Sequence, residues 1–456
     1  LLGDVVSGGI TLNWDAVDNA TSYTLSRNGT IPLEPMDVFD NRYVDSGTDS
    51  SPIVNNSYAY KIATCNEVGC SANAIFTANY FPLNLEKVFN IPDDEVLKLG
   101  GAQSARVAKI DGSSYLFVAG KQDDAVSVFS IADNGALSNV ANVEDGDHAD
   151  LELDGAHSVT LANVSGNNYL FVAGYEDRGV SIFSVADNGA LTSVDNLDDS
   201  SNENYQLREA SSVKVANING SSYLFVSGKQ DDGVSVFSVA DNGSLTNVDN
   251  VDRRDDRDNP NEALNGASSV AIANINGNSY LFVAARDVDG GKDGGVSVFG
   301  VANNGSLENL HNIYDSDNPS YKLKGAISLT VAVLDGTSYL FVAGFGDGVS
   351  VFSIAADGSL DNVANVADSD NPAYEIKSPY FVTVAEIGGS SYLFVAGNAD
   401  DGVSVFSVAA DGSLTNVANM ATNISPTSVT VAEIGGSSYL FVTEFFNGVS
   451  VIKLTQ

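Results

Sequence analysis

Residues 223–226 read Tyr-Leu-Phe-Val, and this stretch decides the fold because it returns throughout the chain. Its seven copies start 47 to 59 residues apart, at Tyr115, Tyr169, Tyr223, Tyr280, Tyr339, Tyr392 and Tyr439. Each copy is followed by Val-Ser-Val or Val-Ser-Ile, and six continue into Gly-Ala-Leu or Gly-Ser-Leu. Self-similarity at this period predicts a repeat architecture.

One repeat divides into four short strands that are rich in Val, Ile, Phe and Tyr: residues 212–218, 223–228, 234–239 and 245–251. Asn-Gly pairs at 219–220 and 242–243 supply the positive φ that tight hairpins require. Four-stranded antiparallel units in series are typical of a β-propeller. A linear β-solenoid is the competing architecture.

The offset between the two ends of the repeat region favours a closed ring. The seventh repeat stops at Gln456 after its third strand, whereas residues 85–91 (Leu-Glu-Lys-Val-Phe-Asn-Ile) match the fourth-strand residues 360–366 (Leu-Asp-Asn-Val-Ala-Asn-Val). We therefore expect residues 84–91 to supply the outer strand of the last blade and to remove the open sheet edges. The expected fold is all-β, with a seven-bladed propeller over residues 83–456.

Residues 236–245, Val-Phe-Ser-Val-Ala-Asp-Asn-Gly-Ser-Leu, resemble the repeat of seven-bladed lactonase-like propellers, the 6-phosphogluconolactonase/YVTN group. The resemblance extends over about residues 83–456. It implies the architecture strongly. It implies the chemistry weakly, because such blades also occur in secreted surface proteins without a known enzymatic role.

Residues 1–82 lack the repeat and resemble a fibronectin type III sandwich. Trp14 matches the core tryptophan of that domain and Tyr58 the tyrosine that braces its corner. Cys65 and Cys70 suit a short disulfide in an oxidising compartment, and a reduced pair is the alternative. The chain opens at Leu1, so we expect a mature form or a piece of a longer protein.

The charge of the chain excludes whole classes of function. Asp and Glu number 59 against 21 Lys and Arg, for a net charge of −38. Such a surface repels nucleic acid and anionic membranes, so we expect no nucleic-acid partner. No run approaches the 18 or so apolar residues of a membrane span, so we expect no membrane insertion. The acidic loops are expected to share one face of the propeller.

Calcium is the cofactor that this acidic face suggests. Three loops place carboxylates two positions apart, as oxygen-ligand loops do: Asp145 and Asp147, Asp315 and Asp317, Asp368 and Asp370. None of them continues into a full twelve-residue calcium loop. Solvated turns, in which Asp accepts backbone hydrogen bonds, are therefore the alternative.

Enzymatic chemistry would need groups that move protons or stabilise anions. Arg106 and Lys214 fall at equivalent positions of inner strands, and His157 stands at the start of another, so all three are candidates for the channel mouth. The alternative is that the arginines pair with Asp and His157 is polar lining. Aromatic residues that break the repeat could stack on a sugar or peptide: Phe345, Tyr380, Phe445 and Phe446.

Two functions are consistent with these patterns. The first is a secreted or cell-surface binding or structural protein, used in adhesion or assembly, whose acidic face meets a protein, a glycan or further copies of the chain. The near-identity of the blades favours it and speaks against an enzyme. The alternative is a lactonase-like hydrolase at the channel mouth.

Overall fold

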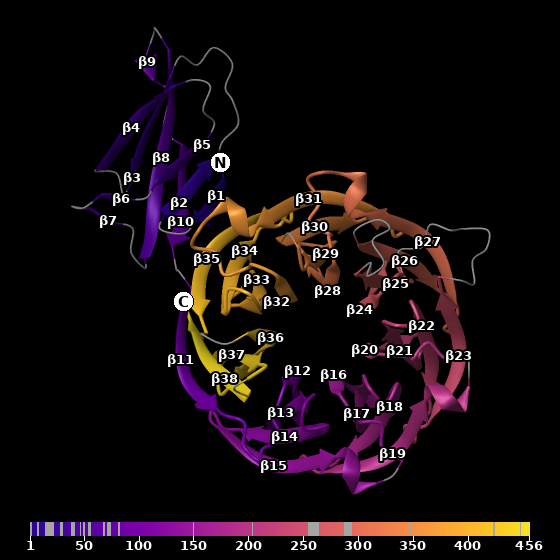
Figure 1. Cartoon of the computed structure of the whole chain (residues 1–456). Helices are drawn as coiled ribbons and strands as arrows, with labels where there is room; N and C mark the ends of the chain where they lie inside the picture. The colour runs from indigo at the N-terminus through magenta and orange to yellow at the C-terminus, as the bar shows by residue number, and fades with distance from the viewer. Residues whose placement is uncertain are drawn as a thin grey trace.

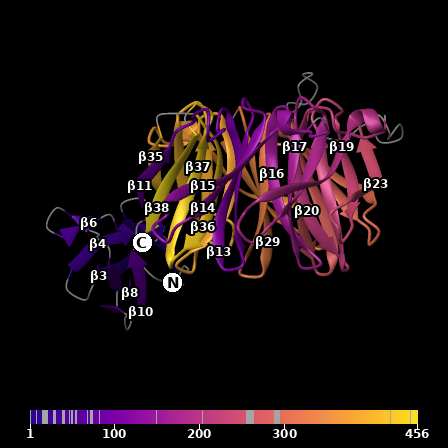
Figure 2. The ribbon, with the colours of Figure 1, turned by 90° about the horizontal axis from the view of Figure 1, so that it is seen from below.

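The computed structural model describes residues 83–456 apart from 149, 203, 254–263, 287–293, 347, 423–424 and 447, together with the strands within residues 2–80. From residue 84 onward the chain forms seven four-stranded antiparallel sheets, which stand as blades around a common axis (Figure 1). Seen from below in Figure 2, the strands run between the two faces of the ring. The expected seven-bladed propeller is confirmed.

In every blade the strands follow one another from the axis outward. Blade 1 consists of β12 (Ala102–Ile110), β13 (Ser113–Gly120), β14 (Ala125–Ile131) and β15 (Leu137–Glu144). Blade 2 consists of β16 (Ala156–Val164), β17 (Asn167–Gly174), β18 (Gly179–Val185) and β19 (Leu191–Asp198). Blade 3 consists of β20 (Ala210–Ile218), β21 (Ser221–Gly228), β22 (Gly233–Val239) and β23 (Leu245–Asp252). Blade 4 consists of β24 (Ala267–Ile275), β25 (Asn278–Ala285), β26 (Gly295–Val301) and β27 (Leu307–Tyr314). Blade 5 consists of β28 (Ala326–Leu334), β29 (Thr337–Gly344), β30 (Gly348–Ile354) and β31 (Leu360–Ala367). Blade 6 consists of β32 (Pro379–Ile387), β33 (Ser390–Gly397), β34 (Gly402–Val408) and β35 (Leu414–Ala421). Blade 7 consists of β36 (Pro426–Ile434), β37 (Ser437–Glu444), β38 (Gly448–Thr455) and β11 (Asn84–Ile91).

The ring is closed by β11, as the sequence predicts. This strand pairs antiparallel with β38, from Asn84 opposite Thr455 to Ile91 opposite Val449. Its pairing is interrupted by a register shift, and the outer strands of the other six blades have a shift at the equivalent place. The borrowed strand therefore reproduces the twist of a regular outer strand.

The repeated tyrosine joins each blade to the next. The Tyr115 hydroxyl donates to the Asp187 carbonyl at 2.9 Å, in the turn where Gly189 has a φ of +83°. The same link to a turn carbonyl recurs at Tyr169, Tyr223, Tyr280, Tyr339 and Tyr439. Blade 7 has no such turn, because its outer strand comes from residue 84. There the Gln456 side chain takes the place of the turn and donates to the Tyr392 hydroxyl at 2.8 Å.

The hydrophobic core is divided into seven clusters, each between adjacent blades. In one of them Phe117 of blade 1 packs with Leu170 and Phe183 of blade 2, and none is more than 1% exposed. Burial on both faces explains why the second strand of each repeat is almost continuously apolar. Packing between blades therefore holds the inner strands around the axis.

Among the loops that the structure describes between an outer strand and the next inner strand, four contain a 3₁₀ turn: η1 (Asp145–Asp147), η2 (Asp199–Ser201), η3 (Asp315–Asp317) and η4 (Asp368–Asp370). Each loop has a fully buried aliphatic side chain shortly before the inner strand: Leu153, Leu207, Leu323 or Ile376, all 0% exposed. Within the described residues, no helix has the length and apolarity needed to cross a membrane.

Residues 2–80 form further short antiparallel strands: β1 (Leu2–Val6), β2 (Gly9–Asn13), β3 (Ser22–Arg27), β4 (Ile31–Asp37), β5 (Arg42–Asp45), β6 (Gly47–Thr48), β7 (Ser51–Pro52), β8 (Asn56–Asn66), β9 (Gly69–Cys70) and β10 (Ala74–Tyr80). The sheets run β1-β2-β5, β10-β8-β3-β4 and β6-β7, with β9 on β8. The fibronectin type III resemblance stays a prediction, because Trp14 and the Tyr58 side chain lie outside the described residues. Cys65 stands opposite Cys70 in the β8–β9 pairing. The Cys70 side chain is outside the described part, so the disulfide also stays a prediction.

Candidate functional site

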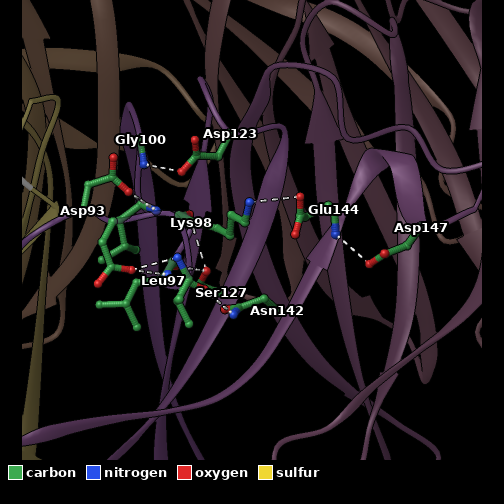
Figure 3. A network of polar contacts seen from close by, with 12 residues as sticks. Asp93, Leu97, Lys98, Gly100, Asp123, Ser127, Asn142, Glu144 and Asp147 are labelled. Atoms are coloured by element: carbon green, nitrogen blue, oxygen red, sulfur yellow. Dashed lines mark hydrogen bonds and ion pairs between the residues drawn. The ribbon is translucent and has the colours of Figure 1, made fainter.

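The acidic loops use their carboxylates to hold backbone in place, as blade 1 illustrates (Figure 3). Asp123 Oδ2 accepts from the Gly100 amide at 2.8 Å, and Asp147 Oδ2 accepts from the Glu144 amide at 3.1 Å. The Glu144 carboxylate is 3.1 Å from Lys98 Nζ. These contacts are those of the solvated-turn alternative.

The carboxylates proposed as calcium ligands make similar contacts. Asp145 Oδ1 accepts from the Leu153 amide at 3.2 Å, and Asp315 Oδ1 accepts from the Leu323 amide at 2.9 Å. Three others accept from the amide three residues earlier: Asp147, Asp317 and Asp370. Burial, followed by the nearby charge of Asp400, raises the pKa of Asp368. In the part of the chain that the structure describes, no three His, Cys, Asp or Glu side chains are grouped so that they could hold a metal ion. Calcium binding stays a prediction.

A cavity of about 490 Å³ lies on the propeller axis, and its charge is opposite to that of the acidic loops. Its walls are the inner strands, and side chains that follow second strands complete its mouth. Five cationic side chains line it: Arg106, Lys121, Lys214, Lys229 and Arg286. No Asp or Glu is among the described residues that line it. A chain of net charge −38 thus encloses a cationic channel.

The mouth of this cavity carries a network around Tyr175. The Tyr175 hydroxyl donates to Glu209 and accepts from Lys229 Nζ at 2.9 Å. Lys229 Nζ also lies 3.3 Å from the Glu209 carboxylate. Lys121 Nζ stands 3.8 Å from the centroid of the Tyr175 ring, and the His157 ring stacks on that ring with centroids 5.2 Å apart. Five side chains from blades 1 to 3 are thereby held together.

The contacts of this network determine the protonation states of Glu209 and Tyr175. Burial alone would raise the pKa of Glu209, but the hydrogen bond from Tyr175 and the charge of Lys229 outweigh it and hold the pKa below its usual range. Burial, followed by the hydrogen bond to Glu209, raises the pKa of Tyr175. Burial lowers the pKa of Lys121. Tyr175 therefore stays a neutral donor and Glu209 a carboxylate at neutral pH.

His157 is held as one neutral tautomer. Its Nδ1 is 2.9 Å from the Ser211 carbonyl, which can only accept, so Nδ1 carries the proton and Nε2 keeps its lone pair. Burial, followed by the charge of Lys121, lowers the pKa of His157 to about 4. At neutral pH the ring is therefore a fixed hydrogen-bond acceptor at Nε2.

Arg106 and Lys214 lie deeper in the channel than His157. Each stands three positions farther along its inner strand than the residue that corresponds to His157, which is Gln103 in β12 and Ser211 in β20. Arg106 lies opposite Phe117 and Lys214 opposite Phe225, at the same level of two blades. The Arg106 guanidinium donates to the Ala105 carbonyl at 3.0 Å. Burial lowers the pKa of Arg106, and burial followed by the charge of Arg106 lowers the pKa of Lys214 to about 8.

Of the four aromatic residues expected to bind a ligand, Tyr380 is the one that lines the cavity. Its hydroxyl accepts from Gln103 Nε2 at 2.8 Å. The Arg286 guanidinium lies over the Phe345 ring, with Cζ 4.6 Å from the ring centroid. Phe445 and Phe446 contact each other edge to face, and Phe446 is 72% exposed. A ligand-binding role for these four residues stays a prediction.

The sequence pattern located part of this site. It selected His157, Arg106 and Lys214, and all three line the same cavity. The expectation that arginines pair with Asp holds for Arg208, whose Nε is 3.0 Å from Asp199. The pattern missed four members of the mouth network: Lys121, Tyr175, Lys229 and Glu209. The sequence does mark the first three, since each follows the Gly that ends the second strand of its blade.

Serines of the inner strands link neighbouring blades. Ser104, Ser158 and Ser212 accept, at 3.3 to 3.4 Å, from an inner-strand amide of the next blade. Ser269 and Ser328 make the same link, at 3.2 to 3.3 Å. The inner strands are therefore tied to one another around the channel as well as packed.

The fold defines a class of protein, the seven-bladed β-propeller. Residues 101–254 match the family model described as Lactonase, 7-bladed beta-propeller. This match spans blades 1 to 3, which supply the network around Tyr175. No curated protein matches the chain.

Two solved structures are similar in fold. The periplasmic gluconolactonase of Pseudomonas aeruginosa is 18% identical with a TM-score of 0.52, over 79% of this chain and 92% of that chain. A protein from Lactobacillus plantarum is 13% identical with a TM-score of 0.51, over 79% of this chain and 91% of that chain. At these identities the similarity establishes the shared propeller.

Proposed function

We propose that the protein hydrolyses a lactone at the mouth of its propeller channel, with His157 as the general base. One observation carries the proposal: a neutral imidazole with a free Nε2 stands near Lys121 and Lys229 in a cavity whose described lining includes no carboxylate. The family model over residues 101–254 supports it. The similarity to the gluconolactonase of Pseudomonas aeruginosa suggests a sugar lactone as the substrate class.

In the proposed reaction a water molecule attacks the lactone carbonyl carbon while His157 Nε2 takes its proton. The new C–O bond leaves negative charge on the former carbonyl oxygen, which the ammonium groups of Lys121 and Lys229 stabilise. The ring C–O bond then breaks, and the imidazolium returns the proton to the departing oxygen. The product is a single open-chain hydroxy acid.

The pKa of His157 fits a base that works beside an anion. With a pKa of about 4 the ring is free of its extra proton at neutral pH. Negative charge that develops near Lys121 offsets the repulsion between this lysine and an imidazolium, and so raises the pKa of His157 as the proton arrives. Tyr175 and Glu209 act as positioning residues, because they hold the stacked ring and the lysines.

The test is turnover of a panel of aldono- and uronolactones, corrected for spontaneous hydrolysis. His157→Asn keeps a donor for the Ser211 carbonyl and removes Nε2, so activity should fall by about 100-fold or more, which is the usual contribution of a general base. His148→Asn, at an exposed loop position, is the matched control and should retain activity. Inactivity of the wild-type chain over the whole panel, or full activity of His157→Asn, would contradict the proposal.

A second candidate function is binding of a glycan or protein at the loop face, as a secreted or surface protein. The exposure of Phe446, next to Phe445, favours it, because exposed aromatic pairs stack on sugars and peptides. A glycan and protein screen with and without EDTA tests both the binding and the calcium expectation. Absence of binding and of any effect of calcium would remove this candidate.

A further inference from the structure

Arg106 and Lys214 are cations without a counter-charge. Within the described residues, neither side chain forms an ion pair, and Lys214 forms no hydrogen bond. A guanidinium has five N–H donors, and the described contacts of Arg106 are one bond to the Ala105 carbonyl and the ring of Phe381 at 5.6 Å. Two cations in one protein-walled channel repel each other, and an anion between them would offset that repulsion.

The wall at this level suits an oxyanion. Thr330, Thr383 and Thr430 stand opposite Phe341, Phe394 and Phe441, at the level of Arg106 and Lys214, and all three threonines line the cavity. Their hydroxyls can donate to oxygens that a guanidinium and an ammonium leave free.

We infer that Arg106 and Lys214 hold a small oxyanion in the channel, beneath the imidazole of His157. The ligand is either a free inorganic or carboxylate ion or the acidic group of a larger molecule that enters the channel. The site goes beyond the proposed hydrolysis, because anion binding requires no turnover. It assigns Arg106 and Lys214 to recognition of negative charge and leaves proton transfer to His157.

The depressed pKa of Lys214 gives this site a testable pH dependence. With a pKa of about 8, the free lysine is partly neutral at pH 8 and mostly neutral at pH 9. A bound anion favours the charged ammonium, so binding takes up protons near pH 8 and weakens as the pH rises above it. Arginine at this position would stay charged and abolish that weakening.

The experiment is isothermal titration of the full chain with sulfate, formate and glucarate, at pH 7 and pH 9 and at constant ionic strength. Arg106→Gln and Lys214→Met should each weaken binding about 10- to 100-fold, which is what one charge-assisted hydrogen bond contributes. Lys109→Met, at an exposed position near the far end of β12, is the matched control and should bind as the wild type does. Lys214→Arg should retain binding at pH 9, and its binding also shows that the channel is intact.

Each outcome decides the inference. Tight binding of sulfate and formate would support a free ion as the ligand, and binding of glucarate alone would support an acidic group on a larger molecule. No saturable binding of any of the three anions, or binding that survives both Arg106→Gln and Lys214→Met, would overturn the inference. His157→Asn should bind anions normally even if it loses all lactone turnover, so failure of one proposal is distinguishable from failure of the other.

Discussion

Replacing Lys121 with methionine tests the electrostatic account of His157. Lys121 Nζ is 3.8 Å and the His157 ring 5.2 Å from the Tyr175 ring centroid, so the lysine nitrogen and the imidazole are at most about 9 Å apart. At that distance and an effective dielectric constant of about 20 to 40, two unit charges repel by roughly 1–2 kcal/mol, which corresponds to about one pKa unit. Lys121→Met should therefore raise the pKa of His157 from about 4 to about 5.

Burial sets the upper limit of this shift. Burial is the largest cause of the low pKa and remains in the variant, so the pKa should stay below the ordinary value of 6.5. The assay is an NMR titration of the histidine ring protons. The chain contains only three histidines, so the His157→Asn spectrum assigns the signal. An unchanged or lower pKa in Lys121→Met would refute the reasoning.

The same shift determines how His157 contributes to stability. Its folded pKa of about 4 lies below the ordinary 6.5, so the unfolded chain binds more protons between these values. The contribution is complete above pH 6.5 and is lost as the pH falls from 6.5 to about 4, by up to roughly 3 kcal/mol. Urea unfolding at pH 7 and pH 4.5 should show a smaller acid-induced loss in His157→Asn than in the wild type, and an equal loss would count against this account.

Three further predictions concern the joints between blades and the mouth of the channel. Gly189→Ala should lower the free energy of unfolding in urea by about 2–3 kcal/mol, because a Cβ there would lie 2.8 Å from a tyrosine ring. Gly112→Ala has the same φ of +83° but open space, so it should cost only the backbone strain of about 1 kcal/mol, and equal losses would refute the packing argument. Gln456→Ala should cost about 1 kcal/mol in urea unfolding through loss of its bond to Tyr392, and an unchanged midpoint would contradict that role. Glu209→Gln should reduce lactone turnover about tenfold with little change in unfolding, whereas undiminished turnover would remove Glu209 from the positioning network.

Local patterns in the sequence were sufficient for the propeller. The alternation of apolar strands with Asn-Gly turns depends on neighbouring residues, and the match between residues 85–91 and 360–366 identified the closing strand. The hydroxyl of the repeated tyrosine was not foreseen as the link to the next blade. Its partner is a carbonyl about 72 residues away at Tyr115 and Tyr169, and no local pattern specifies that distance.

The candidate site could be predicted only in part. His157, Arg106 and Lys214 stand at recognisable positions of the repeat, so their approach to the axis could be deduced. The stacking of His157 on Tyr175 could not be deduced, because it depends on side-chain directions in two different strands. The overall charge was misleading here. It suggested an anionic face, whereas the described lining of the cavity is cationic.

By itself the sequence determined the number of blades, their strand order and the way the ring closes, because these features follow from hydrophobic spacing and turn residues that act over short distances. Only the tertiary structure decided the chemistry of the axis. Closing the ring brings Gln103 to Tyr380, which is 277 positions away, and gathers five cations from blades 1, 3 and 4 around a cavity whose described lining includes no Asp or Glu. The field inside the channel depends on that distribution in space and cannot be read from net charge.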